Sequence, residues 1–524
     1  MQTVADPLEH ARLTAAHKEA IVCGSDRLDY LELWSRCRRL AGYLAGLGLQ
    51  RGDRVAVVAL NCHRYIEAYL AIPSAGYVIV PLNTRSAPAE LEYAARDSQA
   101  RVLLTDREPS PLDALFEHVI RLPDGYEQAI ADAEPAPLGE DIDENDLAGI
   151  FYTGGTTGKA KGVMLTHRNL MANTWTALSW ARPTNDTRWL IMAPLFHAAG
   201  TCNVLATIWV TGSQVILPIS KPGDVLDIIE REQVTATLAV PTLLAAVTDE
   251  QFKQPRDVSS LSLMSHGASP VPTETLLRAA KAFPEAELLH LYGTTETSPI
   301  ATNLPHEERL LGTPAARSCG YPALGVQVRV VDLDGAPLAP GEVGEVAVRG
   351  ANVTRGYWNK PEETAAALRH GWYHTGDLGY LDEDSRLYLV DRLKDMVVTG
   401  GENVYTVEVE DVLSSHPQVA EAAVFGIPDD HWGESLYAVV VPRNGVGAEE
   451  LIEYCRERIA GFKIPKHIEV TAEPLPKSGV GKVLKRELRD PFWSDRETRI
   501  GNRQSVVDNV PIAEAPQSRT HLDQ

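Results

Sequence analysis

Short apolar segments that look like strands alternate with amphipathic helical segments through the first part of this 524-residue chain. The runs RVAVVAL (54–60) and RVLLTD (101–106) are typical of buried strands, whereas residues 29–48 and 63–76 place apolar side chains at helical spacing. Strands that are apolar on both faces and separated by helices favour a parallel sheet covered on both sides. The same alternation returns in RWLIMAP (188–194), GSQVILP (212–218), VTATLAV (234–240) and AELLHLYG (286–293). We therefore predict an α/β fold.

The pattern changes twice further along the chain. From about residue 324, strands are split by Asp-Gly and Pro-Gly turns, which predicts a β-rich subdomain. From about residue 395, two helical segments (406–416 and 449–461) and three strand segments predict a small α+β module. The expected organisation is a large N-terminal domain (1–393, with the β-rich subdomain at about 324–391), a small mobile C-terminal domain (394–490) and a polar, disordered tail (491–524).

The charge balance limits the partners. Because 49 basic and 71 acidic residues give a net charge of −22, a nucleic-acid or anionic-membrane partner is disfavoured. The six cysteines show neither disulfide nor metal spacing, and no segment is long and apolar enough to span a membrane. We expect a cytoplasmic enzyme without a structural metal, a monomer or homodimer.

A run of glycines and threonines, FYTGGTTGKAKG (151–162), is the strongest candidate for a binding loop. Glycines let the backbone approach an anion closely, while hydroxyls and a lysine add donors. It is not a Walker A loop, because Thr153 stands where that motif needs Gly and Ala160 where it needs Ser or Thr. We expect a phosphate loop that follows a strand and leads into the HRNLMANTW helix.

Three further stretches carry candidate residues. LLHLYGTTETSP (288–299) ends a strand at a tyrosine and places a glutamate after a Gly-Thr-Thr turn. The stretch from 373 to 410 contains a Thr-Gly-Asp turn and then an arginine and a lysine at the expected domain boundary. PLPKSGVGKVLKRELR (474–489) sets a lysine on a Gly-rich loop before a basic helix.

These four stretches, in this order and at this spacing, resemble the adenylate-forming superfamily of acyl-CoA synthetases, 4-coumarate ligases, firefly luciferase and adenylation domains. The resemblance covers roughly residues 10–490. Two departures from the family loop are Gly154 in place of Ser and Ala160 in place of Pro. The first removes one hydroxyl contact, and together they imply a looser loop.

The resemblance implies roles for individual residues. Thr153, Thr156, Thr157 and Lys161 would hold the phosphates of ATP, Tyr292 would stack on adenine, Glu296 would bind Mg²⁺, and Asp377 with Arg392 would hold the ribose. Lys482 would bridge the substrate carboxylate and the α-phosphate, and Lys394 would be the hinge of the small domain. The implied ATP site consists of Thr153, Gly154, Gly155, Thr156, Thr157, Gly158, Lys161, Tyr292, Gly293, Thr294, Thr295, Asp377, Arg392 and Lys482.

The resemblance also implies the chemistry. A carboxylate would attack the α-phosphate of ATP to give an acyl-adenylate and pyrophosphate, with Lys482, Lys161, Thr156 and Glu296 offsetting the charge of the two anions. A swing about Lys394 would then bring in Gly400 and Gly401, which leave space for the pantetheine arm of CoA, and Lys463 would meet CoA phosphates. The alternative is that these two glycines form only a turn.

The acid pocket is expected around an aromatic gate and two neighbouring segments. The predicted lining is His197, Ala198, Gly200, His266, Gly267 and Ala268. The small residues after His197 leave room for a flat ring or a medium chain, so we favour an aryl or arylpropenoic acid over a long fatty acid. The alternative for His266 is a buried histidine that serves packing alone.

Other functions stay open at this stage. The acyl-adenylate would pass to an amine in an ATP-dependent amide synthetase, or to a separate carrier protein in a stand-alone adenylation domain. A luciferase-like oxidation has no sequence feature in its favour. A non-catalytic nucleotide-binding module is disfavoured, because Glu296, Lys161 and Lys482 are all present.

Overall fold

The structure is a computed structural model, and its described residues fall into two compact units. Unit 1 comprises Met1–Gln327 and Val348–Tyr373, and unit 2 comprises Val328–Ala347 and the chain from His374 onward. The described residues are 2–153, 160–267, 271, 273–306, 313–332, 334–393, 395–399, 402–429, 431–477 and 483–493.

Unit 1 contains a nine-stranded sheet with the order β15-β14-β13-β12-β11-β9-β10-β1-β2. The strands from β13 to β1 pair in parallel, while β2 at one edge and β14 and β15 at the other pair antiparallel. The strands are β1 (Glu19–Cys23), β2 (Asp26–Asp29), β9 (Arg188–Ile191), β10 (Ser213–Ile216), β11 (Ala236–Ala239), β12 (Leu263–Gly267), β13 (Glu287–Tyr292), β14 (Thr302–Leu304) and β15 (Tyr321–Pro322).

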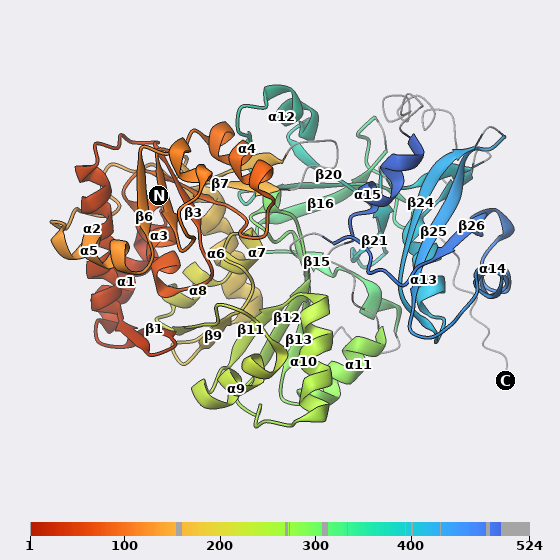
Figure 1. The fold of residues 1–524 in the computed structure, drawn as a ribbon, viewed down its shortest axis with the longest axis horizontal. Helices are drawn as coiled ribbons and strands as arrows, with labels where there is room; N and C mark the ends of the chain where they lie inside the picture. Colours follow the sequence, from red (N-terminus) through yellow and green to blue (C-terminus); the bar gives the residue numbers. More distant parts are fainter. Residues whose placement is uncertain are drawn as a thin grey trace. The chain divides into compact units, whose positions relative to one another are not determined.

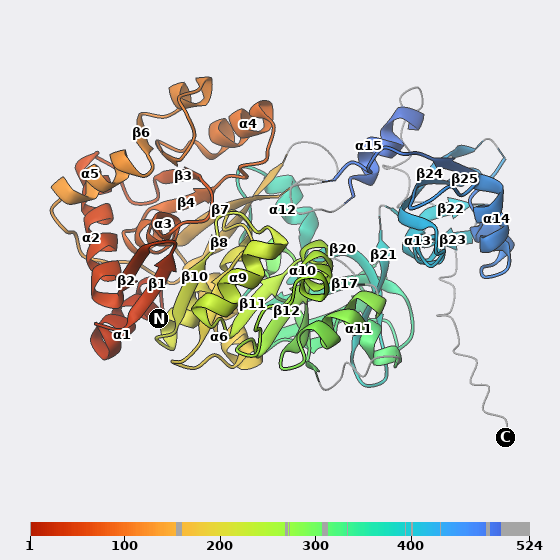
Figure 2. The same cartoon turned by 60° about the horizontal axis from the view of Figure 1, so that its bottom comes forward.

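Three amphipathic helices cover this sheet, as Figures 1 and 2 show: α9 (Pro222–Glu232), α10 (Pro241–Lys253) and α11 (Thr273–Ala282). Their buried residues form one apolar core with side chains of β9, β10, β12 and β13. Other helices of unit 1 are α1 (Ala5–Ala15), α6 (His167–Ala181), α7 (Ala198–Thr201), α8 (Val204–Trp209) and α12 (Pro361–Ala367). The sequence analysis did not single out α9, α10 and α11, although the strands that they cover were predicted.

A second, seven-stranded sheet of unit 1 has the order β18-β8-β7-β4-β3-β5-β6. The helices that alternate with its strands along the chain are α2 (Tyr30–Gly46), which begins with a capping box between Asp29 and Glu32, α3 (His63–Ser74), α4 (Pro88–Ser98) and α5 (Asp124–Asp132). Its strands are β3 (Arg54–Val58), β4 (Val78–Pro81), β5 (Val102–Thr105), β6 (His118–Arg121), β7 (Leu147–Thr153), β8 (Lys161–Thr166) and β18 (Gly356–Tyr357).

One local expectation needs correction. The glycine-threonine loop does not lead directly into a helix, because β8 follows it and pairs antiparallel with β7. Thr166 then ends β8 and caps α6, accepting a hydrogen bond from the Asn169 N–H at 3.2 Å. The loop thus joins two neighbouring strands, and Lys161 is the first residue of the second one.

A third sheet has the order β16-β17-β20-β19, with β21 beside β20. The chain passes from one unit to the other within three of its strands, β16, β17 and β20. Its strands are β16 (Val326–Val331), β17 (Gly344–Gly350), β19 (Leu368–Arg369), β20 (Trp372–Leu381) and β21 (Leu387–Arg392).

The C-terminal part of unit 2 is a five-stranded sheet with the order β23-β22-β25-β24 and β26 beside β25. The side chains of α13 and α14 pack on it in one apolar core. Its elements are β22 (Val397–Thr399), β23 (Glu402–Val404), α13 (Thr406–Ser414), β24 (Val419–Asp429), β25 (Gly433–Pro442), α14 (Ala448–Arg456), β26 (His467–Val470) and α15 (Lys485–Arg489).

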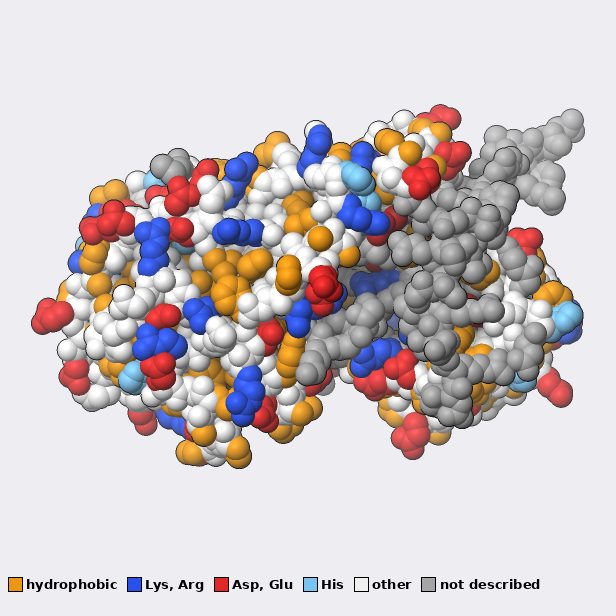
Figure 3. Space-filling view, turned by 90° about the horizontal axis from the view of Figure 1, so that it is seen from above, with side chains coloured by type: hydrophobic (Ala, Val, Ile, Leu, Met, Phe, Trp, Pro, Cys, Tyr) orange, Lys and Arg blue, Asp and Glu red, His pale blue; other side chains and the backbone are white. Residues whose placement is uncertain are grey.

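The architecture confirms the predicted fold class of helix-flanked parallel sheets, a β-rich part and a smaller α+β part. The domain boundaries at residues 393 and 490 stay predictions. Within the described ranges, no helix has the length and apolar character needed to cross a membrane. On the face drawn in Figure 3, basic and acidic side chains are interspersed and form no broad basic area.

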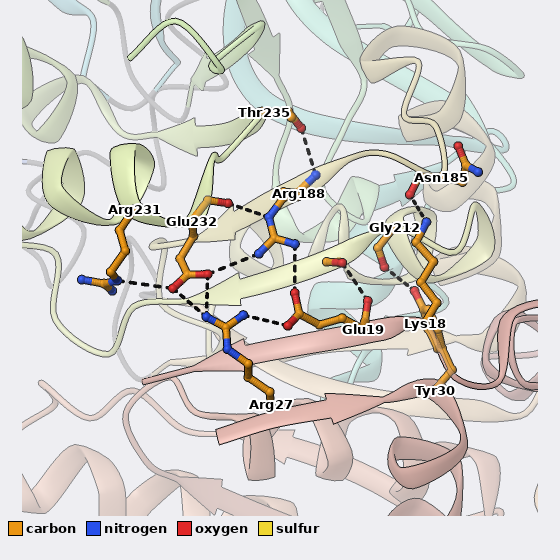
Figure 4. Close-up of polar contacts among 11 residues, drawn as sticks. Lys18, Glu19, Arg27, Tyr30, Asn185, Arg188, Gly212, Arg231, Glu232 and Thr235 are labelled. Carbon is orange, nitrogen blue, oxygen red and sulfur yellow. Dashed lines mark hydrogen bonds and ion pairs between the residues drawn. The ribbon is translucent and has the colours of Figure 1, made fainter. Parts of the chain in front are cut away.

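Four charged side chains tie the edge hairpin β1–β2 to the rest of the nine-stranded sheet (Figure 4). Arg188 of β9 donates to Glu19 of β1 at 2.9 Å and to Glu232 of α9 at 3.3 Å. Arg27 of β2 donates to the same two carboxylates, at 2.7 Å and 2.9 Å. Because the Glu232 side chain is only 6% exposed, its interactions with the two arginines are partly shielded from solvent.

We expect Glu232→Gln to lower the free energy of unfolding by roughly 2 kcal/mol, because two arginines lose a shared, shielded carboxylate. Urea unfolding followed by tryptophan fluorescence measures the change. Arg231→Gln is the control, since the Arg231 side chain is 62% exposed and contacts Glu232 at 3.3 Å. A loss for Glu232→Gln no larger than that of the control would contradict this account of the network.

Candidate active site

A tight turn after β13 positions Glu296. Tyr292 ends the strand, and a Cβ on Gly293 would lie 1.9 Å from the Pro299 carbonyl oxygen, so only glycine fits there. The Thr294 N–H donates to the Thr297 hydroxyl at 2.9 Å, and Thr295–Thr297 form a short 3-10 turn. The implied adenine and magnesium residues, Tyr292 and Glu296, therefore lie at the two ends of one constrained turn.

Asn352 closes this turn from outside. Its side-chain amide donates to the carbonyl oxygens of Thr297, at 2.9 Å, and Ile300, at 2.8 Å. The Ser298 hydroxyl donates back to the Asn352 carbonyl at 2.7 Å. All four residues are buried, so these hydrogen bonds are shielded from water.

Tyr357 connects the Glu296 turn with the start of β8. Its hydroxyl donates to Glu296 Oε1 at 2.9 Å, and the Lys161 Nζ lies 5.1 Å from the centre of its ring. Burial and the Glu296 carboxylate both raise the pKa of Tyr357, so the hydroxyl stays protonated and remains a donor. The structure thus brings together two of the residues implied by the sequence, Lys161 and Glu296.

Of the predicted phosphate-loop residues, Thr153 is described, and it pairs with Lys161 across β7 and β8. The predicted site residues that lie outside the described residues are Gly154, Gly155, Thr156, Thr157, Gly158, Ala268, Lys394, Gly400, Gly401 and Lys482.

The implied ribose pair lies in unit 2, where Asp377 of β20 faces Arg392 of β21 in register. The Arg392 Nε and Asp377 Oδ1 are 3.2 Å apart, and the Asp377 side chain is only 9% exposed. Glu345 supports the preceding turn, since it accepts from the Gly376 N–H at 3.1 Å and pairs with His374 at 2.8 Å. A carboxylate and a guanidinium held side by side form a polar site suited to hydroxyl groups.

The implied acyl gate, His197, caps the short helix α7 and packs on Phe196 at a ring distance of 4.5 Å. Burial first, and the Arg85 charge second, lower the pKa of His197 to about 4, so its ring is neutral at pH 7. Its buried Nε2 has no hydrogen-bond partner within the described parts of the chain. Ala198 is buried, and Gly200 is required because a Cβ would lie 2.2 Å from the Pro194 carbonyl oxygen.

His266 and Gly267 end β12. The His266 ring stacks on His290 of β13, with centroids 5.2 Å apart and planes 12° apart, and His266 is 1% exposed. A Cβ on Gly267 would lie 2.1 Å from the Leu291 carbonyl oxygen, so this glycine permits close strand packing. These contacts fit the packing alternative for His266, and its place in the acid pocket stays a prediction.

The implied acceptor residue Lys463 pairs with Glu408, both carboxylate oxygens lying 2.8 Å from its ammonium group. Nearby in unit 2, Trp432 is 45% exposed, and the Lys466 Nζ lies 5.0 Å from its ring centre. Trp432 directly precedes Gly433, the first residue of β25, which pairs with Thr399, the last residue of β22.

Sequence reasoning missed Tyr357, Asn352 and Glu345. Tyr357 is separated by 61 positions from Glu296, and a tyrosine in a Gly-Tyr-Trp run carries no periodic signal that points to a partner. Tyr357, Asn352 and Glu345 act through contacts with residues far along the chain, and knowledge of those contacts would have been needed to find them.

Family models identify the chain. The model described as AMP-binding enzyme matches residues 8–358, and the model described as AMP-binding enzyme C-terminal domain matches residues 408–482. The chain therefore belongs to the AMP-binding enzyme family, which confirms the adenylate-forming resemblance drawn from its four motifs.

Individual proteins agree with this assignment. A feruloyl-CoA synthase of Amycolatopsis sp is 40% identical over 496 residues, covering 93% of this chain and 98% of the relative. A long-chain-fatty-acid–CoA ligase of Bacillus subtilis (strain 168) is 34% identical over 523 residues, covering 90% of this chain and 91% of the relative. A fatty acid–[acyl-carrier-protein] ligase, ScoC, of Streptomyces coeruleorubidus is 33% identical over 514 residues, covering 95% and 98%.

Solved structures agree as well. ATP-bound MatB from Rhodopseudomonas palustris superposes with a TM-score of 0.86 at 33% identity, covering 94% of this chain and 99% of that one. The o-succinylbenzoate CoA synthetase MenE from Bacillus subtilis, in complex with the acyl-adenylate intermediate OSB-AMP, gives a TM-score of 0.85 at 32% identity, covering 93% and 98%.

The neutral His197 makes stability depend on pH. The folded state keeps this ring neutral down to its pKa of about 4, whereas the unfolded chain protonates it below about pH 6.5. The folded state then binds fewer protons, so the free energy of unfolding falls as pH falls from about 6.5 to about 4.

We expect His197→Gln to reduce this acid-induced loss of stability, measured as unfolding midpoints at pH 7, 6 and 5. His370→Gln, at an exposed histidine, should follow the wild-type pH dependence. If His197→Gln loses as much stability on acidification as the wild type, His197 is not held neutral by burial.

Proposed function

We propose that this chain is an AMP-forming ligase that converts an aryl or arylpropenoic acid into its CoA thioester. The coarser part follows from family membership and the CoA-ligase relatives: the enzyme activates a carboxylic acid with ATP to an acyl-adenylate and transfers the acyl group to CoA. The juxtaposition of Glu296, Tyr357 and Lys161 in unit 1 carries the site assignment.

Lys161, the cation among these three residues, suits the phosphates of ATP. Lys161 is the first residue of β8, so its ammonium group lies where the glycine-threonine loop ends. In the proposal, Lys161 binds the phosphate end of ATP while the loop backbone donates N–H groups to the same oxygens. Tyr292 offers its ring to adenine from the other end of the Glu296 turn, and Asp377 with Arg392 holds the ribose.

Glu296 fits a magnesium ion. Mg²⁺ is usually held by one or two carboxylates together with substrate phosphates rather than by an all-protein cage. Glu296 supplies one buried carboxylate, 9% exposed, on a rigid turn close to Lys161. When bound, the ion would neutralise charge on the phosphate oxygens as pyrophosphate leaves.

Activation joins two anions, so the enzyme has to offset their repulsion. In the proposed step, the substrate carboxylate oxygen attacks the α-phosphorus, the bond to the bridging oxygen breaks, and pyrophosphate leaves with the electron pair. Lys482 bridges the attacking carboxylate and the α-phosphate. Removing one such preorganised donor typically costs ~10²–10³ in rate.

The acid specificity rests on two observations. His197 is neutral and packs on Phe196, so the gate presents an aromatic and largely apolar surface. Ala198 next to it has a small side chain, whereas the space beside Gly200 is filled by the Pro194 carbonyl group. The relative with 40% identity is named as a feruloyl-CoA synthase, a protein that acts on an arylpropenoic acid.

The acceptor assignment rests on a pair of exposed side chains in unit 2. The indole of Trp432 and the ammonium group of Lys466 lie together next to the start of β25, which suits a ligand with both an adenine ring and phosphates. In this proposal Lys463 exchanges its contact with Glu408 for a CoA phosphate. A carrier-protein acceptor, as the name of ScoC indicates for that relative, and an amine acceptor are the competing outcomes.

The first experiment measures pyrophosphate release with ATP and Mg²⁺ across ferulic, 4-coumaric, benzoic, octanoic and palmitic acids. Each acid is tested with CoA, with simple amines, with an acyl carrier protein, and with none of them. We expect the highest kcat/KM for the arylpropenoic acids and thioester with CoA. Lys482→Ala should lose pyrophosphate release by on the order of 10²–10³-fold and still bind ATP.

Mass spectrometry of the products decides among the acceptors. Amide formation without CoA would move the protein to the amide-synthetase function, and acylation of the carrier protein alone would make it an adenylation enzyme for that partner. A preference for palmitic acid would contradict the aryl-acid proposal. The cytoplasmic location and the monomer or homodimer state stay predictions.

Trp432 tests the CoA surface separately. We expect Trp432→Ala to raise the KM for CoA roughly tenfold or more, because base–aromatic stacking contributes about 1–3 kcal/mol. The KM for pantetheine, which has no adenine, should stay unchanged. Phe252→Ala is the control, since Phe252 is an exposed aromatic of unit 1 with an arginine over its ring. Equal effects on CoA and pantetheine would exclude adenine stacking on Trp432.

A further inference from the structure

We propose that Tyr357 is a positioning residue that orients the Glu296 carboxylate for the magnesium ion of bound ATP and couples it to Lys161. This inference rests on the proposed function, because it takes Glu296 as the magnesium ligand. No sequence motif singled out Tyr357, and its role is inferred from contacts within unit 1.

The hydroxyl of Tyr357 fixes one oxygen of the carboxylate. It donates to Glu296 Oε1 at 2.9 Å, and both side chains are only 9% exposed. A buried hydrogen bond to a carboxylate restricts its rotation, as partners of ligating carboxylates do in metal sites. Because the Tyr357 hydroxyl engages Oε1, the carboxylate would be held in one orientation when the metal ion binds.

The backbone around Tyr357 is bonded to Glu296 on one side and to β8 on the other. The Thr354 N–H donates to the Glu296 carbonyl at 2.8 Å, and the Thr354 hydroxyl donates to the Met164 carbonyl at 2.7 Å. The Trp358 N–H donates to the Gly162 carbonyl at 2.8 Å. Segment 354–358 therefore holds the Glu296 turn at a fixed distance from the strand that begins with Lys161.

The ring of Tyr357 makes the second connection. The Lys161 ammonium group lies 5.1 Å from the ring centre, within the range of a cation–π interaction. One side chain thus contacts both groups that the proposal places on the phosphate end of ATP, the cation through its ring and the carboxylate through its hydroxyl.

A purely structural role is the competing explanation. The ring of Tyr357 also lines an open, mostly apolar groove of about 410 Å³ together with Met164, Thr364 and Leu368. Tyr357→Phe separates the two roles, because phenylalanine keeps the ring, its packing and the contact with Lys161 and removes the hydroxyl alone.

The matched control is Tyr126→Phe. Tyr126 is a fully buried tyrosine of unit 1 whose hydroxyl donates to the buried carboxylate of Glu67 at 2.7 Å. Both substitutions remove a buried hydroxyl–carboxylate hydrogen bond, so both are expected to lower the thermal unfolding midpoint. The Glu67 carboxylate has no place in the proposed site.

The experiment titrates ATP into the full-length protein by calorimetry without the acid, at Mg²⁺ concentrations from zero in EDTA to well above the wild-type midpoint. We expect Tyr357→Phe to raise the Mg²⁺ concentration that half-maximally strengthens ATP binding by about 10- to 100-fold. Its ATP affinity in EDTA should equal that of the wild type, and Tyr126→Phe should show the wild-type Mg²⁺ dependence.

Glu296→Gln separates failure of this inference from failure of the proposed site. If Glu296→Gln weakens the response to Mg²⁺ and Tyr357→Phe does not, Glu296 binds the metal without help from Tyr357 and the positioning role is wrong. If Glu296→Gln itself keeps the wild-type response, the metal assignment in the proposed function is wrong and the inference fails with it. A higher Mg²⁺ requirement for both variants supports the positioning role.

Discussion

The candidate site depends on segment 352–358, which lies between two parts of unit 1 and is bonded to both. The side-chain amide of Asn352 closes the turn after β13, while Gly356 and Tyr357 extend the seven-stranded sheet beyond β8. The turn bearing Glu296 belongs to the nine-stranded sheet, and Lys161 belongs to the other one. Without this segment, no element among the contacts described above would fix the distance between the carboxylate and the ammonium group.

The sequence pattern predicted strands that are continuous apolar runs. It did not predict elements that depend on pairing with another segment of the chain. Continuous apolar runs such as RVAVVAL identified the strands, because a strand covered on both faces has no polar side to obscure its pattern. β8 was missed, since its KGVMLT segment follows a polar loop and contains a glycine. Its antiparallel pairing with β7 is a long-range property that periodicity does not encode.

The same limit applies to the site. Glu296, Lys161, Asp377 and Arg392 were found because they sit in motifs, whereas Tyr357 and Glu345 act on them through contacts that no local pattern encodes. The sequence analysis assigned three glycines to ligand sites, whereas the structure shows that backbone packing requires them. A Cβ atom on Gly293, Gly200 or Gly267 would lie within 2.2 Å of a backbone carbonyl oxygen. Close backbone packing therefore requires glycine at these positions irrespective of any ligand.

The distribution of residues between the two units has a consequence for the two half-reactions. Glu296, Lys161 and His197 lie in unit 1, whereas Asp377, Arg392, Trp432 and Lys463 lie in unit 2. Each unit positions its own residues through internal hydrogen bonds and ion pairs, as the Tyr357–Glu296 and Asp377–Arg392 contacts show. The predicted hinge, Lys394, follows Asp377 and Arg392 in the chain and precedes Trp432 and Lys463, so each of these contacts lies wholly on one side of it. The swing about Lys394 that the family resemblance implies would therefore leave the contacts intact in both half-reactions.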